Sequence, residues 1–265
     1  MSSDTQPPDS PPAPVVHVEL ADDIATIVLD SQHNRNALSR QLVAELHAGI
    51  DAAEAAAARA IVLTHRGPAF CAGADLKERA SGRAASPAGS DSNPFVDVLV
   101  RLMDTERPTI AAVEGAVRAG GIGLMAACDL VVVDGSTTFA LTEVRIGVAA
   151  AIISVPILRR VAPSRIAAAL LTGEAFDATE ARSMGLVTHV TDDVPATTAA
   201  LCDGIRMGAP RAVAATKQLL HTVGAMDRTT AFAEMASLSE ELFALPDAAE
   251  GMAAFREKRR PAWAE

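Results

Sequence analysis

The fold is decided by two short stretches of small residues, Phe70-Cys71-Ala72-Gly73-Ala74-Asp75-Leu76 and Ala119-Gly120-Gly121-Ile122-Gly123-Leu124. Each stretch follows an apolar, strand-like run and leads into a helical pattern. Because the side chains are small, a ligand can approach the backbone N–H groups directly. Two such donors aimed at one point would hold a carbonyl oxygen and stabilise an oxyanion, which typically contributes about 100-fold or more per donor. We therefore expect a site between the two stretches.

Composition excludes several classes of function. The chain has 265 residues, of which 49% are hydrophobic, enough for one large domain or for one domain plus an extension. Aromatic residues make up only 3%, and the net charge is −10. Base stacking and general affinity for polyanions both need the opposite balance. The sequence thus predicts no nucleic-acid partner and no membrane partner.

Cysteine usage and the N-terminus indicate the compartment. The three cysteines, Cys71, Cys128 and Cys202, are widely spaced and have no metal-ligand spacing. We expect neither a disulfide framework nor a metal site. The N-terminus lacks a basic region followed by an apolar run, and no apolar run is long enough to span a bilayer. These features predict a cytoplasmic protein.

The chain divides into a tail, a core and an extension. Residues 1–14 contain five prolines and are expected to be disordered. Residues 15–200 carry the pattern of an α/β core, and residues 201–265 that of a helical oligomerisation region. Residues 78–94, rich in Ser, Gly and Ala, would suit a lid over the site.

Hydrophobic patterning predicts the elements of the core. Residues 16–20 and 24–29 form a hairpin, Ser39 caps a helix, and Leu124 to Cys128 begin another helix. Further strands are expected at 61–64, 109–113, 130–133 and 139–141. The repeated order of strand, turn and helix favours stacked ββα units.

Helical signals dominate the second half of the chain. Asp177 and Glu180 read as a capping box, and Gly185 as the stop of that helix. A long amphipathic helix near the C-terminus carries Phe232, Met235, Leu238 and Leu242.

A dinucleotide fingerprint is a competing interpretation of the second stretch. Gly121, Gly123 and Ala126 have its spacing, and Glu143 follows. The fingerprint requires its first glycine directly at the end of a strand, but the strand-like run stops near Val113. We therefore expect no nicotinamide cofactor.

Taken together, the motifs resemble the crotonase superfamily, the enoyl-CoA hydratase/isomerase family. The resemblance also rests on the segments 34–38, 128–129, 172–174 and 255–261. It implies an α/β fold, a crotonase-like spiral of ββα units with a C-terminal helical extension. It further implies an acyl-CoA thioester as substrate, no cofactor other than the coenzyme A of that substrate, and a homotrimer or homohexamer.

The resemblance also assigns site residues. It places the oxyanion donors at the backbone N–H groups of Ala72 and Gly120, with Gly121 beside them. The coenzyme A channel is lined by Ala72, Gly73, Ala74 and Asp75. Phe255 and Lys258 would approach the coenzyme A of a neighbouring subunit.

Proton transfer in such enzymes needs carboxylates beside the thioester. The resemblance places one at Glu143, whereas the position of a second is Gly123, which cannot move a proton. Counting therefore favours a double-bond isomerase, but hydratases and thioester hydrolases of the family also tolerate glycine there. Some similar hydratases handle branched or dicarboxylic acyl groups. We expect an enoyl-CoA hydratase, with an isomerase or an inert acyl-CoA-binding relative as alternatives.

Other charged residues have weaker signals. Arg118 and Arg145 flank the motifs and could meet a distal substrate carboxylate, although surface ion pairs are the simpler expectation. Asp75 is expected to shape its turn rather than to catalyse. Glu143 itself could be a solvated surface residue, the commonest fate of a glutamate.

Overall fold

The structure is a computed structural model that describes residues 13–80 and 93–264. Most of the predicted disordered tail, and most of the predicted lid at 78–94, lie outside the described residues. Residues 78–80, the start of that segment, are described and form the last part of the short helix α2 (Leu76–Ala80).

The larger sheet has six strands in the order β1-β2-β3-β5-β7-β10. β1 (Val16–Ala21) and β2 (Ile24–Leu29) form the predicted antiparallel hairpin. The other strands add in parallel: β3 (Ala60–His65), β5 (Thr109–Val113), β7 (Leu130–Asp134) and β10 (His189–Thr191). Parallel strands require crossover connections, and this is where the helices of the core lie.

A second, smaller sheet has the order β4-β6-β8-β9. Its strands are β4 (Ala69–Cys71), β6 (Ala116–Arg118), β8 (Thr138–Ala140) and β9 (Ala175–Asp177). Along the chain, β3 is followed by β4, β5 by β6 and β7 by β8. The first strand of each pair lies in the larger sheet and the second in the smaller sheet. A helical segment follows each pair. This alternation produces the predicted spiral of ββα units.

Side chains of the larger sheet alternate between two apolar clusters, as the two-residue period of a strand requires. Ile61, Leu63 and Val131 pack into the main core with α1 (Arg40–Ala55) and α3 (Pro94–Asp104). Val62 and Val132 point to the opposite face, where α8 (Val194–Arg206) covers them. Both faces of the sheet are therefore covered by helices.

The predicted helix caps are confirmed. The Ser39 hydroxyl accepts from the Leu42 N–H at 3.2 Å. Asp177 and Glu180 form a reciprocal capping box at α7 (Ala178–Met184), with Gly185 as its C-cap. The start of one helix was predicted wrongly: α4 spans Gly120–Ala126, four residues earlier than expected. Burial of the α4 residues from Gly121 onward offsets the low helix propensity of its glycines.

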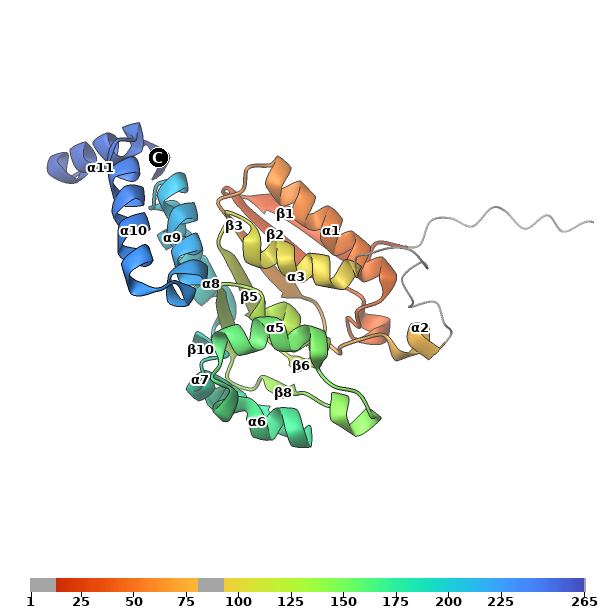
Figure 1. Ribbon diagram of the computed structural model, residues 1–265. Helices are drawn as coiled ribbons and strands as arrows, with labels where there is room; N and C mark the ends of the chain where they lie inside the picture. Colours follow the sequence, from red (N-terminus) through yellow and green to blue (C-terminus); the bar gives the residue numbers. More distant parts are fainter. Residues whose placement is uncertain (1–12, 81–92, 265) are drawn as a thin grey trace, which may run out of the picture.

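The connection from β8 to β10 contains the 3-10 helix η2 (Glu143–Ile146) and the helices α5 (Ala151–Arg160) and α6 (Pro163–Thr172), followed by β9 and α7. The C-terminal region continues with α9 (Pro210–Thr222), α10 (Arg228–Phe243) and α11 (Pro246–Glu257). Figure 1 shows α9, α10 and α11 extending away from the two sheets. The predicted boundary at residue 200 falls within α8.

Buried polar contacts fasten this region to the core. Lys217 of α9 is buried and forms an ion pair with Asp129 at 2.9 Å. Its ammonium also donates to the carbonyl oxygens of Leu102 and Arg107. Near the C-terminus, the Trp263 indole N–H donates to the Met207 carbonyl oxygen at 3.0 Å. A buried cation that is paired in this way holds α9 in one position, because moving it would leave Asp129 uncompensated.

Candidate active site

Two backbone amides lie close together where the two small-residue stretches meet, and both residues line one cavity. A Cβ placed on Gly120 would lie 3.9 Å from the nitrogen of Ala74, and one placed on Gly73 would lie 3.5 Å from the nitrogen of Gly120. No hydrogen bond among the described residues uses the N–H of Ala74 or of Gly120. Gly120 is the first residue of α4, where N–H groups have no partner within the helix. The pair therefore has the form of an oxyanion hole.

The prediction for Ala72 as a donor needs correction. Its N–H donates to the carbonyl oxygen of Arg35 at 3.1 Å and is already used. The left-handed backbone of Gly73, with φ of +88°, turns the chain after Ala72, and the next amide, that of Ala74, is the one left unpaired. Ala72 still lines the cavity described below.

The glycines keep the two stretches in direct contact. A Cβ on Gly73 would lie 2.8 Å from the Cβ of Ala119, and one on Gly121 would lie 2.7 Å from the Cβ of Cys71. Both distances are too short for any side chain. Ala119 itself has φ of +46°, a conformation that costs a non-glycine residue about 1–3 kcal/mol. The backbone is thus strained immediately before the amide of Gly120.

Asp75 shapes its turn, as expected. Its carboxylate accepts from the N–H groups of Lys77 and Glu78 and from the Asn34 side chain at 3.1 Å. Burial raises the pKa of Asp75, but the hydrogen bonds outweigh this effect and hold the pKa below its usual value. The ionised carboxylate fixes the start of α2 and is not among the residues that line the cavity.

Glu143 is the chemically distinctive side chain of the region. It lies at the start of η2, and its Oε2 atom is buried without a hydrogen-bond partner among the described residues. Burial raises the pKa of its carboxyl group above the usual value, opposed only by a hydrogen bond from its own backbone. A half-buried carboxylate with an unused oxygen is poised to exchange protons with a ligand.

One cavity of about 410 Å³ joins the two amides and this carboxylate. Its lining includes Ala74, Gly120 and Glu143, and most of the remaining wall is apolar. The apolar part comes from Leu38, Leu76, Phe95, Ile146, Val148, Ala149, Ala150, Ala151, Ile152 and Ile153. A ligand carbonyl held by the amides would therefore direct its neighbouring carbons past Glu143.

Gly123 lies under the side chain of Ile153. A Cβ on Gly123 would lie 2.3 Å from Cγ2 of Ile153 and 2.6 Å from its Cβ. The space that a second carboxylate would need is therefore filled by an aliphatic residue of α5. Glu143 is the only carboxylate among the described residues that line the cavity.

Comparison with known proteins identifies the family. A family model described as enoyl-CoA hydratase/isomerase matches residues 19–265. The chain belongs to the enoyl-CoA hydratase/isomerase family.

Solved structures and curated relatives agree with this assignment. The crystal structure of an enoyl-CoA hydratase from Mycobacterium avium is 39% identical, covers 94% of this chain and 98% of its own, and has a TM-score of 0.71. That of an enoyl-CoA hydratase/isomerase from Marinobacter aquaeolei is 31% identical, covers 95% and 99%, and has a TM-score of 0.86. The mevalonyl-coenzyme A hydratase of Aspergillus fumigatus is 36% identical over 216 residues, 76% of each chain.

The two arginines considered from the sequence lie outside the cavity. Arg118 donates to the carbonyl oxygens of Val117 and Thr138, and Arg145 donates to the carbonyl oxygen of Thr172 at 2.9 Å. Neither forms an ion pair with a described residue, so the expectation of surface ion pairs is also wrong. Both arginines serve as local braces of the backbone.

Phe255 and Lys258 are not brought to the cavity of their own chain. They lie at the end of α11, which Figure 1 shows at the opposite end of the molecule from α2. Phe255 is 87% exposed. The predicted contact of these residues with a neighbouring subunit's coenzyme A stays a prediction.

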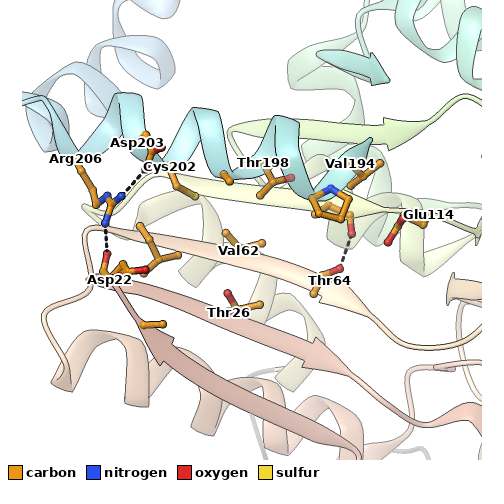
Figure 2. A pocket seen from close by; sticks show the side chains of 15 residues that line it. Asp22, Thr26, Val62, Thr64, Glu114, Val194, Thr198, Cys202, Asp203 and Arg206 are labelled. Atoms are coloured by element: carbon orange, nitrogen blue, oxygen red, sulfur yellow. Dashed lines mark hydrogen bonds and ion pairs between the residues drawn. The ribbon is translucent and has the colours of Figure 1, made fainter. Parts of the chain in front are cut away.

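A second cavity, of about 350 Å³, lies between α8 and the outer face of the larger sheet (Figure 2). Its charged residues at one end are already engaged: Arg206 pairs with Asp203 and donates to the Asp22 carbonyl oxygen. Thr64 donates to the Ala112 carbonyl oxygen. The features of the first cavity, free amides beside an unpaired carboxylate, are not repeated here.

Residues 13–80 and 93–264 contain no cluster of three or more His, Cys, Asp or Glu side chains suited to a metal ion. None of the helices in this part of the chain is long and apolar enough to cross a membrane.

Two residues of the cavity were missed by sequence reasoning. Ile153 carries no motif, and only the fold places it against Gly123. Arg79 follows Asp75 by four residues in a polar segment that was assigned to the lid. Its spacing from Leu76 could have indicated that both side chains line the cavity, because residues three apart lie on the same face of a helix.

Proposed function

We propose that this protein is an enoyl-CoA hydratase, which adds water reversibly to the double bond of a 2-enoyl-CoA thioester. The observation that supports this most strongly is the shared cavity of Glu143, with its unpaired oxygen, and the free amides of Ala74 and Gly120. The names of the relatives as hydratases support the same reaction. Coenzyme A enters as part of the substrate, and no separate cofactor is required.

The amides of Ala74 and Gly120 hold the thioester oxygen. As the oxygen of water bonds to C3, the C2–C3 double bond opens and its electrons move to the thioester oxygen, giving an enolate. The Glu143 carboxylate takes the proton from that water. It then delivers a proton to C2, the enolate collapses to the thioester, and Glu143 is ionised again.

Isomerisation is the second candidate, and the contact between Gly123 and Ile153 favours it. One carboxylate suffices to remove a proton from C2 of a 3-enoyl-CoA and to return it to C4. Hydration demands more of Glu143, because the same group must serve both water and C2. An inert acyl-CoA-binding relative is disfavoured, because an unpaired buried carboxylate oxygen costs stability and brings no packing benefit.

A panel of 2-enoyl-, 3-enoyl- and 3-hydroxyacyl-CoA thioesters tests the proposal, with products identified by mass. Hydration adds the mass of one water, whereas isomerisation leaves the mass unchanged.

Glu143→Gln should retain thioester affinity and lose most turnover, about 100-fold or more, because the amide keeps the shape but cannot accept the proton. Glu174→Gln, at an exposed glutamate outside the cavity, is the matched control and should keep full activity. Full turnover by Glu143→Gln would refute the proposed role.

A further inference from the structure

Hydration by a single carboxylate leaves the attacking water short of hydrogen-bond partners. A water held only by Glu143 could rotate about that one bond, and a second contact fixes the direction in which its oxygen meets C3. Gly123, the position of a second carboxylate, has no side chain, and Ile153 fills the space beside it. The second contact must therefore come from another residue that lines the cavity.

Thr142 provides the neutral polar side chain of this cavity. Among the described residues of the lining, only Arg79, Thr142 and Glu143 have polar side chains. Arg79 lies exposed on α2, and a guanidinium donates hydrogen bonds but accepts none. Thr142 is half-buried and directly precedes Glu143. Its hydroxyl is thus the one side-chain group of this lining, besides the Glu143 carboxylate, that can accept a hydrogen bond from water.

The fold makes no use of the Thr142 hydroxyl. Thr142 is the N-cap residue of η2, a position where a threonine hydroxyl ordinarily accepts from an N–H of the first turn. Such a cap typically has an extended backbone, but Thr142 has φ of −88° and ψ of 7°, and its side chain forms no capping bond. Its carbonyl oxygen accepts from the Arg145 N–H at 3.0 Å, whereas its hydroxyl has no partner among residues 13–80 and 93–264.

We propose that the Thr142 hydroxyl accepts a hydrogen bond from the attacking water and then from the 3-hydroxyl group of the product. This assignment rests on the proposed hydration. One hydrogen of the water passes to Glu143, its oxygen bonds to C3, and the other hydrogen stays on that oxygen and points at Thr142. No proton passes through Thr142. Its contribution is the orientation of the water, about 10-fold in rate for one hydrogen bond between neutral groups.

Thr142 thereby separates the two candidate reactions. Isomerisation moves a proton from one carbon to another and uses no water, so it needs Glu143 and the two amides alone. Exchange of the C2 protons of a saturated thioester with solvent makes the same limited demand. A change at Thr142 should therefore affect hydration and leave proton transfer at carbon intact.

Thr142→Val tests this, because valine keeps the shape of the side chain and removes the hydroxyl. With 2-butenoyl-CoA, its kcat for hydration should be about 10-fold lower, whereas Thr142→Ser should stay within about twofold of the wild type. The rate of C2 proton exchange on butanoyl-CoA in heavy water should change less than about twofold in Thr142→Val. Thr216→Val, at an exposed threonine of α9 outside the cavity lining, is the matched control and should keep both rates.

Affinity for the product gives a second readout. On the Glu143→Gln background, which suppresses turnover, Thr142→Val should weaken binding of 3-hydroxybutanoyl-CoA about 5-fold or more and leave that of butanoyl-CoA unchanged, as measured by calorimetry. The difference between the two thioesters is the 3-hydroxyl group alone.

The possible outcomes separate this inference from the function on which it rests. Hydration by Thr142→Val within twofold of the wild type would overturn the inference and leave the proposed hydration standing. Equal losses of hydration and of C2 exchange would also overturn it, because they would indicate a displaced Glu143. A wild type that forms no 3-hydroxyacyl-CoA from any 2-enoyl thioester would instead overturn the proposed hydration, and the assignment of Thr142 with it.

Discussion

At the residue scale, the chemistry rests on groups that the fold leaves without partners. The sequence was sufficient to propose Glu143, because it lies in a motif, and to propose Gly120. It could not distinguish Ala72 from Ala74, since neighbouring amides point in different directions. Only the left-handed turn at Gly73 decides which amide is free. The same applies to the unpaired Oε2 of Glu143, which depends on every surrounding side chain.

The raised pKa of Glu143 predicts a pH-dependent effect on stability. Burial favours its protonated form in the folded state, so the folded protein binds a proton more tightly than the unfolded chain does. The stabilising contribution of protonated Glu143 is present below the ordinary pKa of about 4.3 for a glutamate and is lost as the pH rises through the folded-state value.

Glu143→Gln removes this dependence, because glutamine stays neutral. We expect the difference in Tm between Glu143→Gln and the wild type to be more positive at pH 7 than at pH 4. Thermal unfolding at both pH values measures it, with Glu174→Gln as the exposed control. A difference that is constant across this range, or that falls with pH, would contradict the burial of the carboxylate.

At the scale of elements, sequence patterns predicted the strands of five or six residues and missed most of the three-residue strands. Strands of five or six residues can be recognised from the sequence, β1 by alternation of apolar and polar residues and β5 as a continuous apolar run. β4, β6 and β9 have only three residues each, and no period can be read from three positions. Their existence depends on the neighbouring strands that pair with them. The packing of α4 on α5 is likewise a property of the fold, and it explains Gly123.

A double-mutant cycle tests that packing. Gly123→Ala should lower the free energy of unfolding by about 1–3 kcal/mol, because the new methyl group overlaps Ile153. On an Ile153→Ala background the same change should cost less, by about 1 kcal/mol, since the nearest atom is gone. Denaturant titration gives all four values. Gly204→Ala, a glycine of α8 with nothing within 4 Å of the added Cβ, is the control and should be neutral or slightly stabilising. Strict additivity in the cycle would show that Ile153 does not occupy the space beside Gly123.

At the scale of the whole molecule, the C-terminal helices present an unusual amount of apolar surface. None of the residues of α10 is buried, and Phe232, Phe243 and Phe255 are 74%, 66% and 87% exposed. The buried ion pair of Lys217 and Asp129 fixes α9, so these side chains are held away from their own core. Large exposed apolar surfaces of this kind mark interaction sites. The sequence predicted a helical extension here, but its exposure follows only from the arrangement of the helices.

We therefore expect the wild type to be a trimer or hexamer by light scattering, with Phe255 and Lys258 of one subunit near the coenzyme A of another. Deleting the whole tail would also remove Trp263 and its contact with Met207, so substitution is the cleaner change. Phe255→Ala combined with Lys258→Ala should weaken thioester binding. The part of the loss that comes from Lys258 should shrink as salt rises, because exposed charges are screened beyond about 10 Å at 0.1 M salt.

The control variant combines Leu171→Ala with Arg182→Ala. It removes an exposed apolar side chain and an exposed cation from the surface of the α/β core, and it should change neither assembly nor thioester binding. A monomeric wild type would contradict the predicted assembly, and a Phe255/Lys258 variant with full affinity at low salt would contradict the predicted contact with coenzyme A.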